Sequence, residues 1–203
     1  SILLYSGASS PSSMELADII TNIGCIARDS VQSTGTDLLF LSSSGVRSLG
    51  RVIQEKSSPI GDVSINVRDD LVRAIAVETG NIKSVYSEED AFYLLILPQE
   101  NQQVFCFDLR GKLENGGNRV TTWPFTGILC GTTANDNKIY FGSSKGVNHY
   151  SGFLDDNSTY TMKDYTHSLS FGDASRLKLL KEIRFTIVGG QGTTLLLRSE
   201  EHT

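Results

Sequence analysis

Residues 92–108, FYLLILPQENQQVFCFD, decide the predicted fold. Two apolar runs rich in aromatic and branched residues flank a polar turn at 98–101, which is typical of two antiparallel strands joined as a hairpin. The same order of strand, Gly/Ser/Asn turn and strand recurs at 37–49 and at 138–150. Equivalent strand positions, Phe40, Leu95 and Tyr140, are 55 and 45 positions apart. One hairpin per unit at such a spacing is typical of β-propeller blades.

A shorter apolar run precedes each hairpin, at 23–27, 84–86 and 127–131. We expect these runs to be inner strands, where small residues let neighbouring blades approach a central axis. The sequence therefore predicts an all-β, β-propeller-like array of short antiparallel hairpins over 1–165. It also predicts a C-terminal β-hairpin region over 166–203 that packs on the array or closes it. A β-sandwich or barrel stays open as the alternative, since these folds also string short strands together.

One segment breaks the strand pattern, at about 57–79. Its apolar residues recur every three or four positions, which predicts one helix inserted between the first two hairpins. Asp62 is placed to cap its start, and Gly80 follows its end. The opposite side is polar and is expected either to face solvent or to contact a neighbouring subunit.

Composition places the chain among ordinary globular proteins, with 203 residues, 39% hydrophobic content and a formal net charge of −5. No apolar run reaches the length of about 18 residues that predicts a membrane span. No basic excess points to sequence-specific nucleic-acid binding. The chain begins at Ser1 without Met or a basic leader and stops soon after an apolar run, so we expect a fragment of a longer protein.

Metal and redox sites receive little support from the sequence. The three cysteines, Cys25, Cys106 and Cys130, lie in apolar runs without a C-x-x-C motif and are expected to be buried free thiols, with a Cys106–Cys130 disulfide left open. The histidines share no ligand spacing. A calcium-like start at Asp155 lacks the Gly and Glu that such a loop requires. We predict no metal and no cofactor.

A nucleophile-elbow motif, G-x-S-x-G, occurs at 142–146. In hydrolases this serine lies between a strand and a helix, whereas here a second strand is expected to follow. We therefore interpret 142–146 as a hairpin turn and predict that the chain is not an enzyme. A serine hydrolase using Ser144 is kept as the second alternative function. The first alternative is a β-propeller module that binds a small ligand or carbohydrate.

Several stretches resemble one family. They are GCIARDSV (24–31), DLLFLS (37–42), GVRSL (45–49), QEKSSPIGDVS (54–64), NVRDDL (66–71), FYLL (92–95), VFCFD (104–108), WPF (123–125) and LSFGDASRLK (169–178). The chain resembles, over roughly residues 23–190, the tail nozzle proteins of short-tailed bacteriophages, also called tail tubular or stabilisation proteins.

This resemblance implies a non-catalytic structural protein of the virion tail, made in the bacterial host cytoplasm. Such proteins form a ring, typically sixfold, below the portal and adaptor, where they take part in DNA retention and ejection. A β-propeller is among their domains. The implied partners are other copies of the chain, the portal or adaptor, and other tail proteins, without specific reading of DNA sequence.

The predicted helix and the loop before it carry mixed charges, which favour specific pairing between proteins. We predict a structural or contact patch formed by Arg47, Gln54, Glu55, Lys56, Arg68, Asp69 and Asp70. In the alternative, Arg47 and Asp69 or Asp70 only tie the helix to the first hairpin. Because an open strand array has unpaired edges, we also expect either pairing of residues 1–5 with a C-terminal strand or self-association.

Overall fold

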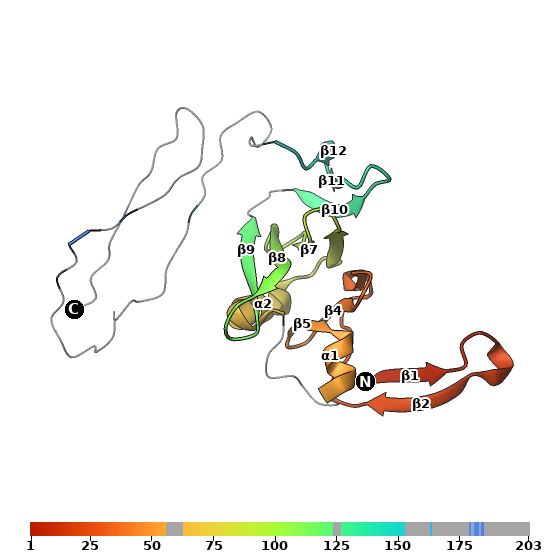
Figure 1. Ribbon diagram of the computed structural model, residues 1–203. Coiled ribbons are helices and arrows are strands. Elements are labelled where there is room, and N and C mark those ends of the chain that lie inside the picture. The colour runs from red at the N-terminus through yellow and green to blue at the C-terminus, as the bar shows by residue number, and fades with distance from the viewer. Residues whose placement is uncertain are drawn as a thin grey trace. The chain divides into compact units, whose positions relative to one another are not determined.

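The computed structural model describes residues 1–55, 63–123 and 127–152, together with the isolated positions 163, 179, 181, 182 and 184. All described helices and strands lie in one compact unit, Ser1–Phe153, and the predicted hairpin at 166–203 falls outside the described segments. This unit is mostly β-structure in small antiparallel sheets (Figure 1). The prediction of a β-rich chain is confirmed, and none of the described sheets closes on itself.

Four groups of strands follow one another along the chain. The N-terminal hairpin contains β1 (Ile2–Ser6) and β2 (Glu15–Ile20). The first sheet contains β3 (Gln32–Ser33), β4 (Leu38–Ser42) and β5 (Gly45–Ser48). The second sheet contains β6 (Lys83–Ser87), β7 (Phe92–Leu97), β8 (Gln103–Lys112) and β9 (Asn118–Trp123). The third sheet contains β10 (Ile128–Thr133), β11 (Ile139–Ser143) and β12 (Gly146–His149).

All three predicted hairpins form, as the pairs β4–β5, β7–β8 and β11–β12. The runs predicted to precede the second and third hairpins also form strands, β6 and β10. The prediction of a strand at 23–27 is wrong, and the short β3 pairs with β4 instead.

The segment at 23–27 contacts β4 without forming a strand. The amide of Ile26 donates to the carbonyl of Leu41 (2.9 Å), but Ser30 occupies the other hydrogen-bonding position of Leu41. The Ser30 hydroxyl donates to the carbonyl of Ala27 (2.6 Å) and accepts from the amide of Leu41 (2.9 Å), so a side chain takes a place that a strand backbone would occupy. Ile23 is nevertheless buried against Phe40. The apolar pattern at 23–27 therefore predicted burial correctly for Ile23, whereas Cys25 and Ile26 are exposed.

The prediction of a single helix at 57–79 is wrong in length and number. The structure has α1 at Leu49–Glu55 and α2 at Arg68–Val77, with a 3-10 turn at Ile65–Val67 before α2. Two acidic residues, Asp69 and Asp70, stand in the first turn of α2, where the helix dipole favours negative charge. Residues 56–62, with the expected cap Asp62, lie outside the described segments. The predicted apolar side of this region does face the core, since Leu71 is fully buried.

The second sheet is buried on both faces. Alternate residues of β7 point to opposite sides, so Tyr93 and Leu95 pack toward the first sheet and α2, while Leu94 and Ile96 pack toward the third sheet. On the first side their neighbours include Leu39, Leu41, Val46 and Leu71; on the second they include Ile128, Ile139 and Phe141. Burial on both faces explains why residues 92–97 form an uninterrupted apolar run.

The first strands of successive sheets touch one another. Gln32 on β3 donates from Nε2 to the carbonyl of Ser84 on β6 (3.0 Å). Thr133 on β10 donates from Oγ1 to the carbonyl of Tyr86 on β6 (2.6 Å). At Gly131 a Cβ would stand 2.7 Å from Cγ2 of Val85, so only glycine fits between β10 and β6 without movement. Glycine at 131 therefore permits the close approach of β10 to β6.

The N-terminal hairpin is attached to the first sheet through one face. Ile2, Leu4 and Ile20 pack with Phe40 of β4 and Val52 of α1. β1 pairs with β2 through Leu3 opposite Ile19 and Tyr5 opposite Leu16. The partner of residues 1–5 in the described structure is thus β2, while the C-terminal strands of the other expectation lie outside the described residues.

The C-terminal end of α2 is held by one carboxylate. Glu78 accepts hydrogen bonds from the amides of Gly80 (3.0 Å) and Gln99 (3.0 Å) and from the Asn101 side chain (3.1 Å). Partial burial raises the pKa of Glu78, but the hydrogen bonds from Asn101, Gly80 and Gln99 together lower it further, so its net pKa lies below the ordinary value. This network joins α2 to the turn between β7 and β8.

Glu78→Gln is expected to lower the free energy of unfolding at pH 7 by about 1–2 kcal/mol, because hydrogen bonds to a charged acceptor are lost. Since the pKa is lowered on folding, the charged group stabilises the protein above its unfolded pKa and loses that effect as the pH falls through its folded pKa. The difference between wild type and variant should therefore shrink from pH 6 to about pH 3. Urea unfolding at several pH values measures it, and a pH-independent difference would contradict this account.

Candidate functional site

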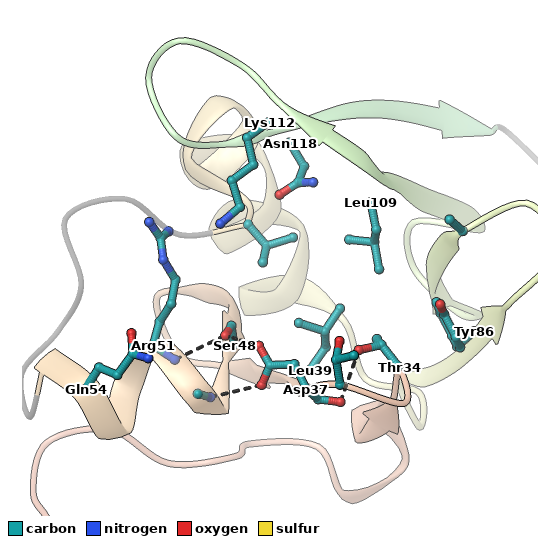
Figure 2. A pocket seen from close by; sticks show the side chains of 14 residues that line it. Thr34, Asp37, Leu39, Ser48, Arg51, Gln54, Tyr86, Leu109, Lys112 and Asn118 are labelled. Carbon is teal, nitrogen blue, oxygen red and sulfur yellow. Dashed lines mark hydrogen bonds between the residues drawn. The ribbon is translucent and has the colours of Figure 1, made fainter.

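A pocket of about 520 Å³ lies between the first and second sheets, beside α1 (Figure 2). Lys112 and Asn118 reach it from the second sheet, across from Asp37 and Ser48 of the first (Figure 2). The complete lining consists of Thr34, Thr36, Asp37, Leu39, Ser48, Gly50, Arg51, Gln54, Val63, Tyr86, Ala91, Leu109, Lys112 and Asn118.

Asp37 in this pocket organises the start of α1. One carboxylate oxygen accepts from the amides of Leu38 (2.7 Å) and Gly50 (2.9 Å), and the other accepts from the Ser48 hydroxyl. The Ser48 hydroxyl in turn accepts from the amide of Arg51 (3.3 Å). The first amides of a helix lack partners within the helix, and these side chains supply them. This explains why a helix begins at Leu49, where the sequence predicted the end of a strand.

Asp37→Ala is expected to lower the free energy of unfolding by about 1–2 kcal/mol, because α1 loses the acceptor at its N-terminus. Glu89→Ala, which removes an exposed carboxylate from the turn between β6 and β7, is the matched control and should change it by less than about 0.5 kcal/mol. Urea unfolding followed by circular dichroism compares the two variants. Equal stability of both would show that Asp37 does not hold α1 in place.

The chemistry that this pocket offers is hydrogen bonding and charge. Arg51 and Lys112 contribute basic groups to the lining, while Asp37 contributes the carboxylate already bound to backbone amides. Among the lining residues there is no histidine or cysteine.

The described residues of the predicted contact patch lie on β5, α1 and α2. Arg47 is 2% exposed and donates from Nη2 to the Ser44 hydroxyl (2.7 Å), so it belongs to the interior. Gln54 and Glu55 are exposed at the end of α1, and Gln54 also lines the pocket. Lys56 lies outside the described segments.

The remaining patch residues lie at the start of α2. Arg68 is half-buried, whereas Asp69 and Asp70 are exposed. The carboxylate of Asp70 pairs with Nη2 of Arg73 (2.7 Å), and Arg73 also donates to the carbonyl of Asp69 (3.2 Å). The interaction recorded for Asp70 is thus with the next turn of its own helix. Such an exposed pair contributes little to stability.

Ser144 lies in the turn between β11 and β12, so strand–turn–strand is the observed context of the G-x-S-x-G motif. The neighbouring Ser143 hydroxyl donates to the carbonyl of Gly146 (3.1 Å) and accepts from the amide of Lys145 (3.2 Å), a pattern typical of a polar turn. His149 stacks on Tyr140 with ring centroids 5.0 Å apart. Within the described residues, no recorded hydrogen bond joins Ser144 to a histidine or an acid.

The three cysteines are free thiols, but only Cys106 is buried. Burial raises the pKa of the Cys106 thiol to about 12, so it is protonated at neutral pH. The expectation of burial is wrong for Cys25 and Cys130, which are exposed. Cys106 points into the core between the second and third sheets, whereas Cys130 lies against Gly142 on the far side of the third sheet. The two thiols therefore lie on opposite sides of the third sheet.

In the described part of the chain, no group of three or more His, Cys, Asp or Glu side chains converges on a possible metal position. The calcium-like start at Asp155 lies outside the described segments. No helix among the described residues is long and apolar enough to cross a membrane.

One feature of the surface was missed by sequence reasoning. The outer face of the N-terminal hairpin exposes Leu3, Tyr5, Leu16 and Ile19, each by 48–49%. A strand has two faces, but residues 2–4 are all apolar, so the sequence does not indicate which face of β1 is covered. Only the packing of Ile2, Leu4 and Ile20 against Phe40 settles it.

Comparisons of the chain with protein-family models, with curated protein sequences and with solved structures find no match.

Proposed function

We propose that this chain is a non-catalytic structural component of a bacteriophage virion tail. In this proposal it belongs to the nozzle or stabilisation ring below the portal and adaptor and takes part in DNA retention and ejection. The resemblance of 24–31, 37–49 and 66–71 to tail nozzle proteins is the sequence basis. These stretches lie in or beside the first sheet, α1 and α2.

The observation that carries the proposal is the burial of the second sheet between the sheets before and after it in the sequence. Successive antiparallel sheets that stack face to face, with their first strands adjacent, are the arrangement of propeller blades. The hydrogen bonds from Gln32 to Ser84 and from Thr133 to Tyr86 lie between such first strands. We therefore propose that the three sheets are consecutive blades of a β-propeller-like array.

Such an array suits a component that must stay rigid under mechanical load while DNA passes through the tail. Both faces of the second sheet are closely packed, and packed interiors transmit strain without large rearrangement. Tyr93 adds a buried link, because its hydroxyl donates to the carbonyl of Ser30 (2.7 Å) in the turn before the first sheet. A rigid body with mixed surface charge can make specific contacts with neighbouring subunits.

The proposed partners are further copies of the chain in a ring, the portal or adaptor, and other tail proteins. The proposed location is the virion tail, after synthesis in the host cytoplasm. Specific recognition of DNA sequence is not part of the proposal. Any contact with DNA that passes through the tail would not depend on the base sequence.

The proposal is tested on purified phage particles. Quantitative mass spectrometry should find the chain at a fixed ratio to the portal protein, and antibodies against it should label the tail in electron micrographs. Particles that lack the chain should fail to retain or eject DNA. A chain found only in the soluble host fraction, and absent from particles, would overturn the proposal.

A carbohydrate-binding module remains the second candidate because aromatic side chains gather near the third sheet. Trp123 stacks on Tyr150 with centroids 5.4 Å apart, and Tyr140 stacks on His149. In each pair, one face of each ring is covered by the partner ring. A sugar would have to bind to the opposite face of one of these rings. Binding of the chain to a glycan array, lost in Tyr150→Ala, would favour this candidate over the structural one.

A further inference from the structure

The described sheets form a stack whose two ends both expose apolar side chains. Along the stack, the N-terminal hairpin packs on the first sheet, the first on the second and the second on the third. Each internal apolar face is covered by the next group of strands. Among the described residues, no further group of strands covers the outer face of the hairpin or the outer face of the third sheet.

The outer face of the hairpin consists of two cross-strand pairs, Leu3 with Ile19 and Tyr5 with Leu16. All four side chains are close to half exposed. A two-stranded hairpin is only marginally stable by itself and depends on the surfaces that cover it. Contiguous exposed apolar side chains of this kind mark interaction surfaces.

The outer face of the third sheet follows from strand alternation. Ile139 and Phe141 point into the core, so Gly142 and its cross-strand neighbour Val147 belong to the opposite face. Val147 is 76% exposed, and nearby Leu129 on β10 is 42% exposed. Glycine at 142 makes this face shallow, and a Cβ there would meet Sγ of Cys130 at 2.7 Å.

The charges at the two ends are opposite. Residues 1–27 contain Glu15 and Asp18 and no lysine or arginine. The turns that border the third sheet carry two lysines, Lys138 and Lys145, against one carboxylate, Asp136, so this end has a small positive excess. Opposite charges around two apolar faces favour their association and disfavour pairing of the hairpin with another hairpin.

We propose that the outer face of the N-terminal hairpin docks on the outer face of the third sheet of a second copy of this chain. The contact continues the sheet-on-sheet stacking from one molecule to the next. Because two different faces meet, the contact is head-to-tail and generates a ring or an open chain of subunits. The inference deepens the proposed function by naming the surfaces through which copies would meet.

The exposed apolar area of the hairpin sets the expected strength of the contact between two copies. Four large side chains of ~200 Å² each, all close to half exposed, give an exposed apolar area of roughly 400 Å² on the hairpin. A stable pair of proteins buries about 800 Å² per partner. A single contact is therefore weak, and association should appear only at high protein concentration unless ring closure adds further contacts.

The test uses the full chain and two variants, Leu16→Glu on the hairpin and Val147→Glu on β12. Sedimentation velocity should show concentration-dependent oligomers of the wild type and weakening of at least ~10-fold in each variant, because a carboxylate would be buried at the contact. An equal mixture of the two variants should form a dimer with one copy of each. In that dimer one intact hairpin face meets one intact face of the third sheet.

Two further variants control for folding and for general loss of apolar surface. Leu3→Glu should behave as Leu16→Glu does, and circular dichroism should show that each variant keeps the β-structure of the wild type. Val77→Glu changes a side chain that is 58% exposed at the end of α2, which belongs to neither face, and should leave association unchanged.

Three results would overturn the docking proposal: a monomeric wild type at all concentrations, unchanged association of Val147→Glu, or a mixture of the two variants that stays monomeric. The second result would mean that the hairpin binds elsewhere. A chain that is monomeric in solution but present in phage particles would overturn the docking proposal and leave the proposed function standing.

Discussion

Replacing Phe107 with alanine should lower the free energy of unfolding by about 3–5 kcal/mol, as is typical for a large aromatic side chain lost from a core. Phe107 is fully buried on β8, and its ring lies 5.9 Å from that of Tyr93 between centroids. The side chain faces the first sheet and α2, so its loss leaves a cavity at the junction of three elements. Urea unfolding at pH 7 measures the change.

Val77→Ala is the control for this prediction. It removes an apolar side chain that is 58% exposed, and alanine favours helix at that position. Its free energy of unfolding should stay within about 0.5 kcal/mol of the wild type. A loss for Phe107→Ala no larger than for Val77→Ala would show that the first and second sheets do not share a core.

Replacing Gly131 with valine should lower the free energy of unfolding by about 1–3 kcal/mol or more, through overpacking. A Cβ at this position would stand 2.7 Å from Val85, 3.1 Å from Phe141 and 3.3 Å from Ile96. Valine suits a strand, so the loss would not come from backbone preference. The measurement tests directly whether close approach of β10 and β6 holds the second and third sheets together.

Gly111→Val provides the matched control, because a Cβ at Gly111 meets no atom within 4 Å. This variant should be as stable as the wild type or slightly more so. In addition, Gly131→Ala should be partly rescued by Val85→Ala, since the second change removes the nearest clashing atoms. Independent, additive effects of these two substitutions would contradict the contact between the strands.

The positions of the polar side chains depend partly on the local sequence and partly on tertiary contacts. Asp37 has no motif in the sequence that marks it, since its hydrogen-bond partner Gly50 lies 13 positions away. Arg47 is part of the structural or contact patch predicted from mixed charges, but β5 is covered on both faces and Arg47 lies inside. Exposed Asp70, by contrast, lies on the polar side of a helix as its spacing indicated.

The sequence by itself determined three strand pairs, β4–β5, β7–β8 and β11–β12. Hairpin partners are close along the chain, and alternating or continuous apolar runs around polar turns specify them, as the register of Leu95 with Phe105 illustrates. The same local information placed β6 and β10 and the apolar side of α2, but it extended the helix too far and misjudged residues 23–27.

Only the tertiary structure decided which sheet faces which, where α1 begins and which face of the N-terminal hairpin is covered. These features depend on contacts between residues that are far apart in the sequence, such as Gly131 with Val85 and Phe40 with Ile20. A hydrophobic pattern states that a side chain will be buried, but it does not name the surface that buries it.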